Sequence, residues 1–122
     1  MSLLNRYIYF NSRDEFFRIN VSQIVYFEAD KNYTTLYLKN GHKIIFTISL
    51  QRMQEYLSDK LAEDARSFAR IGKSYIININ YVYRIDIVKQ SLKLMVPDSS
   101  TIFTLSPSKE ALKNLRSIYI PQ

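Results

Sequence analysis

Three short polar segments of the chain carry side chains suited to binding a polyanion. The first, Lys31-Asn32-Tyr33, places a cation, an amide and an aromatic ring at a predicted turn between two strands. Amide and aromatic groups in such a turn can reach the edges of bases or the sugars. The same residues also suit an ordinary turn in which Tyr33 packs on the sheet, and the sequence leaves both interpretations open.

The second segment surrounds one of the two glycines of the chain. Arg66, Arg70 and Lys73 concentrate positive charge around Gly72. Glycine permits a tight bend, which would project Lys73 from a strand end, while Ser74 and backbone N–H groups could bind phosphate oxygens. A plain β-turn with a solvated lysine is the alternative interpretation.

The third segment, Ser106-Pro107-Ser108-Lys109, precedes a predicted helix. Serine is a preferred N-cap and proline suits the first helical position, so we expect Ser106 as the N-cap and Pro107 as the first helical residue. The free N–H groups of a helix N-terminus attract anions. Capping without any ligand would use Ser106 in the same way.

The distribution of charge points to one stretch of the chain. Among 122 residues, 17 Lys and Arg oppose 11 Asp and Glu, which gives a net charge of +6. Residues 65–96 hold six basic side chains and one acidic side chain, so nearly all of the excess lies there. This stretch is a candidate footprint for a polyanion, although a solvated surface explains the charge equally well.

Other kinds of chemistry lack their usual residues. The absence of cysteine excludes disulfides, thiol catalysis and zinc–thiolate clusters. The one histidine, His42, lies in a predicted Asn-Gly turn, and no nucleophile-elbow motif is present. Gly41 and Gly72 stand alone, so there is no glycine-rich phosphate loop. We therefore expect no enzyme activity, no metal and no cofactor.

Length and hydropathy predict one domain, residues 1–122. No apolar run approaches the roughly 20 residues that cross a bilayer. The first residues lack the basic and apolar regions of a secretory signal. We expect a soluble cytoplasmic domain that does not contact membranes.

Two-residue alternation of apolar and polar side chains predicts a mainly β fold. The expected strands cover residues 6–11, 15–20, 23–29, 33–38, 43–48, 67–71, 74–78, 83–88, 91–96 and 101–105. Leu50, Met53, Leu57 and Leu61 recur every three or four residues, which predicts an amphipathic helix over about 49–63 with Ser49 as N-cap. A short C-terminal helix is expected over about 107–116.

Several of these motifs, in this order, resemble the LytTR family of bacterial DNA-binding domains. Ile24-Val-Tyr-Phe-Glu-Ala-Asp-Lys-Asn-Tyr33 resembles the family's apolar strand, which ends in Glu-Ala and leads to a loop with Asn-Tyr. Gly41 and Ser49-Leu50 follow as the family's turn and helix start. The most specific match is Phe68-Ala-Arg-Ile-Gly-Lys-Ser-Tyr-Ile-Ile-Asn78, with Val82 four residues on. The resemblance covers about residues 24–115, and residues 1–23 form a predicted hairpin.

The resemblance implies an elongated fold of about ten antiparallel strands in small packed sheets. Such domains read double-stranded DNA through loops in successive major grooves, serve as output domains of two-component response regulators, and usually recognise direct repeats in promoters. By position, Tyr33 would lie in the first base-contacting loop and Lys73 in the second, with Arg70 and Ser74 holding phosphates. The candidate DNA-binding residues are Lys31, Asn32, Tyr33, Arg70, Lys73, Ser74, Ser106 and Lys109.

Two positions depart from the family pattern. Gly72-Lys73 stands where the family usually has His-Arg, which removes one donor and exchanges a forked guanidinium for a point charge. Ser106-Pro107 stands where Ser-Arg is frequent, and Lys109 could substitute loosely. These departures keep open an alternative function, an adaptor or protein-interaction module with weakened or non-specific DNA binding.

The input to such a regulator is not visible in the sequence. Family members commonly carry a receiver domain or membrane segments before this domain, whereas residues 1–23 predict only two short strands. We therefore expect a stand-alone regulator or an excised domain without an attached receiver. A receiver or sensor protein would then act in trans, and tandem sites would bring a second copy onto the DNA.

Overall fold

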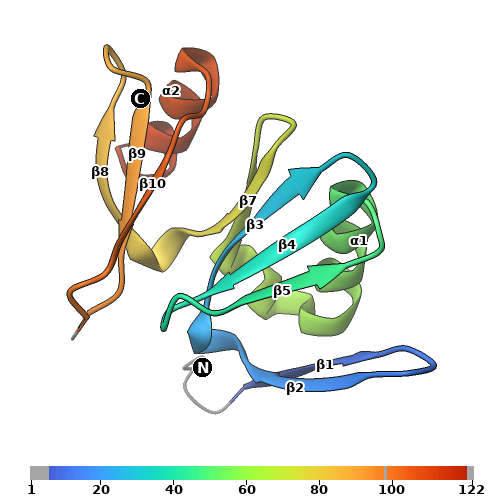
Figure 1. Cartoon of the computed structure of the whole chain (residues 1–122). Helices are drawn as coiled ribbons and strands as arrows, with labels where there is room; N and C mark the ends of the chain where they lie inside the picture. The colour runs from blue at the N-terminus through green and yellow to red at the C-terminus, as the bar shows by residue number, and fades with distance from the viewer. Residues whose placement is uncertain (1–5, 98, 121–122) are drawn as a thin grey trace.

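Alternating apolar side chains build three antiparallel sheets in the computed structural model, which describes residues 6–97 and 99–120 (Figure 1). A hairpin pairs β1 (Tyr7–Asn11) with β2 (Phe16–Asn20). The five-stranded sheet has the order β5-β4-β3-β7-β6 and contains β3 (Ile24–Asp30), β4 (Tyr33–Leu38), β5 (Lys43–Phe46), β6 (Phe68–Ile71) and β7 (Tyr75–Asn78). The third sheet has the order β10-β9-β8 and contains β8 (Val82–Asp86), β9 (Ser91–Met95) and β10 (Ile102–Leu105). These ten strands in the described residues confirm the predicted mainly β fold.

The first helix matches its prediction closely. α1 spans Leu50–Leu61, and the Ser49 hydroxyl accepts a hydrogen bond from the Arg52 backbone N–H at 3.2 Å, as an N-cap does. The helix ends where Ala62 adopts a left-handed φ of 49° and a 3-10 helix (Ala62–Ser67) begins. Neither α-helix in the described ranges is long and apolar enough to cross a membrane.

The second helix begins later than predicted. α2 spans Lys109–Tyr119, and Ser108 is its N-cap, since its hydroxyl accepts the Ala111 N–H at 3.2 Å. The prediction of Ser106 as N-cap and Pro107 as first helical residue is therefore wrong. Leu105 still pairs with Leu92 in the sheet, so residues 106 and 107 are needed to carry the chain from β10 to the helix.

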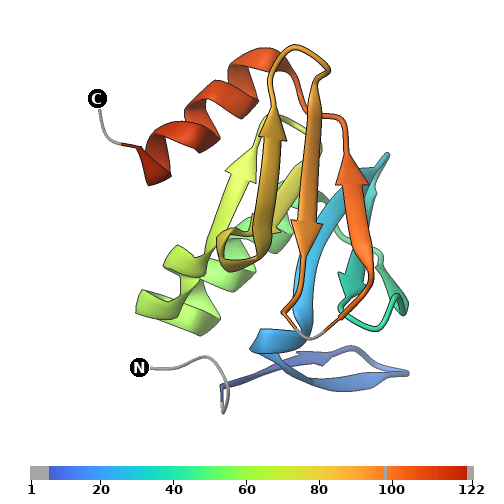
Figure 2. The ribbon, with the colours of Figure 1, turned by 90° about the vertical axis from the view of Figure 1, so that its left-hand side faces the viewer.

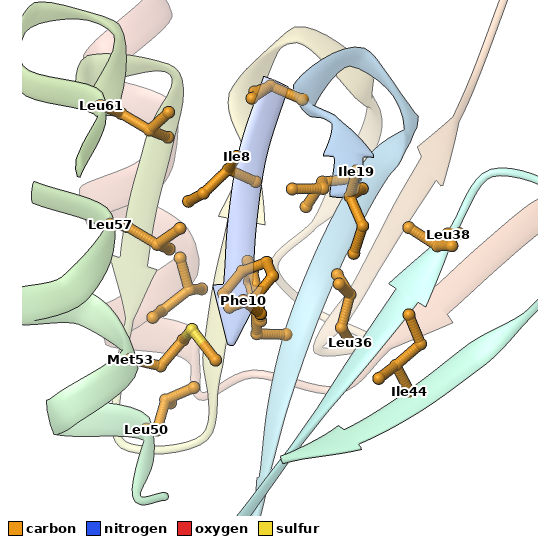
Figure 3. Close-up of a cluster of buried hydrophobic side chains, with 14 residues drawn as sticks. Ile8, Phe10, Ile19, Leu36, Leu38, Ile44, Leu50, Met53, Leu57 and Leu61 are labelled. Atoms are coloured by element: carbon orange, nitrogen blue, oxygen red, sulfur yellow. The ribbon is translucent and has the colours of Figure 1, made fainter. Parts of the chain in front are cut away.

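One face of the five-stranded sheet is covered by α1 and by the N-terminal hairpin (Figure 3). The spacing predicted for α1 places its four apolar residues on the buried side, and they point toward the apolar side chains of β1. The buried side chains of this first core are Ile8, Phe10, Ile19, Val21, Ile24, Phe27, Leu36, Leu38, Ile44, Leu50, Met53, Leu57, Leu61 and Ile76. The hairpin is thus part of the core and not an appendage.

The opposite face is covered by the three-stranded sheet and α2, which lie side by side in Figure 2. The buried side chains of this second core are Val25, Tyr26, Ile71, Ile77, Leu92, Leu94, Val96, Leu105, Ala111, Leu112 and Leu115. Tyr75 packs against this core beside Ile77, while Ile76 points into the first, which confirms the alternation predicted for this strand.

The central strand β3 supplies both cores. Its register with β4 shifts between Ile24 and Tyr26, which marks a β-bulge. Val25 and Tyr26 therefore both face the second core, whereas Ile24 and Phe27 face the first. A bulge inserts one extra residue and rotates the strand locally, which is what this change of side requires.

We expect Leu57→Ala to lower the free energy of unfolding by about 2–5 kcal/mol, because a buried leucine truncated to alanine loses apolar contacts and leaves a cavity. Urea unfolding followed by circular dichroism measures this change. Ser58→Ala, on the exposed face of the same helix, is the matched control and should stay within about 0.5 kcal/mol of the parent. Equal effects of the two substitutions would contradict this packing of α1.

Candidate nucleic-acid interface

The ends of several strands meet at one edge of the molecule, along the top of Figure 1. Here β3 turns into β4, β6 into β7, β8 into β9, and β10 leads to α2. We call this surface the loop edge and define it as residues 31–33, 72–74, 87–90 and 106–109. All three segments singled out in the sequence lie on it, together with the β8–β9 turn.

Hydrogen bonds hold the first two segments of the loop edge side by side. The Ala29 N–H donates to the Ser74 carbonyl at 2.8 Å, and Glu28 pairs with Tyr75 across β3 and β7. Lys31 takes a left-handed φ of 58° at the turn. Tyr33 opens β4 with 47% of its surface exposed, so its ring is accessible to a ligand and is not packed under the sheet.

The second and third segments line a common groove of about 490 Å³. Residues 71–75 form one wall, and residues 106–108 with the first turns of α2 form the other. The α2 N-terminus, whose free N–H groups favour anions, therefore opens beside Lys73. Glu110 also lines the groove and opposes an anion there, so Lys73 is the side chain of the lining that can attract one.

Gly72 provides the bend that the sequence predicted. Its φ is +60°, a left-handed conformation that residues with a side chain rarely adopt. A Cβ built there would meet the Ala111 Cβ at 3.9 Å, an ordinary van der Waals contact. Backbone conformation, and not lack of space, is what favours glycine at this tip.

The half-buried Arg70 side chain folds back over its own turn and onto α1. Its Nε donates to the Gly72 carbonyl at 3.0 Å and its Nη2 to the Lys73 carbonyl at 3.2 Å. Its Nη1 donates to Gln54 Oε1 at 2.8 Å and to Gln51 Oε1 at 3.4 Å. Four of the five guanidinium N–H donors are thus engaged, and they fasten the β6–β7 turn to α1. This geometry favours a positioning role for Arg70 over the predicted phosphate contact.

Each of the four segments of the loop edge carries one exposed lysine. These are Lys31, Lys73, Lys89 and Lys109. None of them forms an ion pair with any residue in the described ranges, so their charge is free to attract a polyanion. Lys89 was not among the predicted contacts, although it lies in the strongly basic stretch 65–96.

A cluster of tyrosine rings lies on the face of the five-stranded sheet that packs against the second core. Tyr26 stacks on Tyr37 with ring centroids 4.3 Å apart, and Tyr75 meets Tyr26 edge-on at 6.3 Å. Burial, with smaller contributions from Tyr37 and Glu28, raises the pKa of Tyr26. Burial also raises the pKa of Tyr37, whose hydroxyl donates to Glu28 at 3.4 Å. The Tyr26 and Tyr37 phenols therefore stay neutral at physiological pH, and their rings pack against the second core.

Among the described residues, no group of three or more His, Asp or Glu side chains is placed to hold a metal ion. Seven of the eight predicted contacts lie exposed on the loop edge: Lys31, Asn32, Tyr33, Lys73, Ser74, Ser106 and Lys109. The prediction missed Gln51 and Gln54, because nothing in the sequence of a helix shows which loop its polar side chains meet.

Fold and interface together define a mainly β domain with a basic edge of strand-end loops. The family model of the LytTr DNA-binding domain matches residues 14–119. The chain therefore belongs to the LytTr family of DNA-binding domains, and this membership supports DNA binding and regulation of transcription in general.

A solved structure shares this fold. It is the LytTr DNA-binding domain of a Bacillus cereus protein described as a putative methyl-accepting/DNA response regulator. The two chains are 20% identical and superpose with a TM-score of 0.62 over 93% of this chain and 96% of the other. No curated protein sequence matched the chain.

Ser108→Ala should lower the free energy of unfolding by about 0.5–2 kcal/mol, because it removes the hydroxyl that caps α2. Ser106→Ala, two residues earlier and exposed, should change stability by less than about 0.5 kcal/mol. Thermal or urea unfolding of the two variants distinguishes the caps. A larger loss of unfolding free energy in Ser106→Ala than in Ser108→Ala would instead indicate that Ser106 caps the helix.

Arg70→Ala should free the β6–β7 turn, because four hydrogen bonds to that turn and to α1 are lost. We expect faster amide hydrogen exchange at residues 72–74, with DNA affinity reduced but its salt dependence unchanged. Arg66→Ala, whose guanidinium bonds only to Glu63 among the described residues, is the matched control. A salt slope lowered by about 0.9 in Arg70→Ala would indicate a lost phosphate contact instead.

Proposed function

We propose that this protein is a bacterial transcription regulator that binds double-stranded DNA sequence-specifically through the loop edge, with its loops in successive major grooves. The observation that carries the proposal is the row of three exposed lysines, Lys31, Lys73 and Lys109, one on each of the three sequence segments that meet at a single edge. A polyanion with regularly spaced phosphates fits such a row better than a small ligand does.

Each segment has a role consistent with its side chains. Asn32 and Tyr33 are accessible for base edges and sugars, while Lys31 is free for a phosphate. Lys73 projects from the Gly72 bend and can donate to guanine O6 or N7. Ser74 lies exposed beside it, where its hydroxyl can donate to a phosphate.

The third segment adds groups that attract phosphate. Ser106 and Lys109 lie at the entrance of α2, where helix N–H groups add to their attraction for phosphate. Pro107 is buried, and its carbonyl accepts a bond from Gln90, so it contributes shape and no base contact. We expect the protein to bind promoter direct repeats in the cytoplasm, two copies to a site, with a receiver or sensor protein acting in trans.

The second candidate function is that of an adaptor, a protein-interaction module that no longer recognises a specific base sequence. It is favoured by the two tips that lack a donor, since Gly72 has no side chain and Pro107 is turned inward. Its expected partner is a protein that co-purifies with it. Selection of bound duplexes from a random pool separates the candidates, because enriched short repeats support the regulator and complete failure to retain DNA supports the adaptor.

Lys73→Ala should weaken binding to a selected duplex by about 1–3 kcal/mol, the usual cost of losing a base-edge contact, and should relax preference at one base position. Fluorescence anisotropy at several salt concentrations measures this. Lys43→Ala removes the same charge at the opposite end of the five-stranded sheet and is the matched control. If both variants lose the same affinity for DNA, the attraction is generally electrostatic and Lys73 does not recognise a base.

A further inference from the structure

The β8–β9 turn is a fixed tip with an exposed cation. The Gln90 N–H donates to the Ile87 carbonyl at 3.2 Å, and the Lys89 N–H donates to Asp86 Oδ1 at 3.0 Å. Gln90 takes a left-handed φ of 51° to close the turn. Val88, 83% exposed, and Lys89 are left pointing outward. The turn is therefore shaped before any ligand arrives.

The turn lies at one end of the loop edge. β9 pairs with β10 so that Leu92 faces Leu105, which brings the β8–β9 turn to the same end as the exit of β10. Gln90 Nε2 donates to the Pro107 carbonyl at 3.5 Å, which links the turn to the segment before α2. In Figure 1 the β8–β9 turn, the α2 start, the β6–β7 turn and the β3–β4 turn follow one another across the top. The β8–β9 turn thus lengthens the contact surface beyond the three segments.

The electrostatics of the tip favour an anion. Asp86 is the one carboxylate in residues 65–96, and its charge is partnered by Arg84 at 3.7 Å and by the Lys89 N–H. Lys109, in contrast, is followed directly by Glu110. Lys89 is thus a cation whose nearest acidic neighbour along the chain is already bound.

The chemistry of the tip fits a phosphodiester better than a base. Of its two exposed polar side chains, Gln90 donates its amide N–H to the Pro107 carbonyl. The other, Lys89, is a single ammonium, a point charge without the paired donors that read a guanine or adenine edge. Val88 beside it offers only an apolar surface, which suits a deoxyribose. We infer that the β8–β9 turn is a fourth DNA contact, in which Lys89 binds a backbone phosphate outside the stretch held by the other three segments. This inference rests on the proposed function.

Affinity for a mixed-sequence duplex, measured by anisotropy from low to moderate salt, tests this contact, because a phosphate contact does not depend on base sequence. Lys89→Ala should reduce the slope of log K against log salt by about 0.9, so the affinity ratio to the parent protein changes about eightfold over a tenfold salt range. Lys89→Arg should restore the parental slope, which a merely structural role of the lysine would not predict. Lys43→Ala, at the opposite end of the five-stranded sheet, should leave the slope unchanged.

The outcomes separate this inference from the function on which it rests. If Lys89→Ala keeps the parental slope while Lys73→Ala binds more weakly, the fourth contact is wrong and DNA binding through the other segments stands. If the parent protein does not bind the duplex at low salt, both are overturned. Matching thermal unfolding of the variants and the parent protein establishes that any loss of binding is local.

Discussion

The double burial of β3 is the constraint on which the rest of the structure depends. A strand that is apolar on both sides must be covered twice, by α1 and the hairpin on one face and by α2 and the third sheet on the other. The bulge at Val25 settles how its side chains are shared between the two cores. Because both layers are fastened to the same strand, the segments that follow β3, β6 and β10 are held at one edge, and the loop edge is a product of this packing.

The sequence pattern predicted those elements of the fold that depend on interactions between residues close together in the chain. Alternation located the strands, and the spacing of leucines with the Ser49 cap located α1, because burial of one face and satisfaction of free N–H groups are properties of neighbouring residues. The start of α2 was placed two residues early, since both Ser106 and Ser108 are good caps and the choice depends on how far β10 stays paired with β9. That pairing is a tertiary property.

At the loop edge, too, features set by neighbouring residues were predictable and features set by tertiary contacts were not. Composition and glycine placement indicated that segments 31–33 and 72–74 would be exposed tips. The structure adds that Ala29, near the end of the strand that leads to the first tip, donates a backbone hydrogen bond to Ser74 of the second. The direction of Arg70 could not be predicted, because its partners Gln51 and Gln54 come from a helix distant in sequence. The loop edge therefore combines two kinds of residue, those whose side chains are exposed on the loops and those, such as Arg70, whose hydrogen bonds hold the loops in place.

The N-terminal hairpin bears on where this domain begins. The family model starts at residue 14, in the turn between β1 and β2, whereas Ile8 and Phe10 of β1 are buried against α1 and the sheet. A fragment cut at the family boundary would expose the apolar surface that these two side chains cover and would leave β2 without its partner strand. A boundary for excision or fusion that keeps this core intact therefore lies before Tyr7.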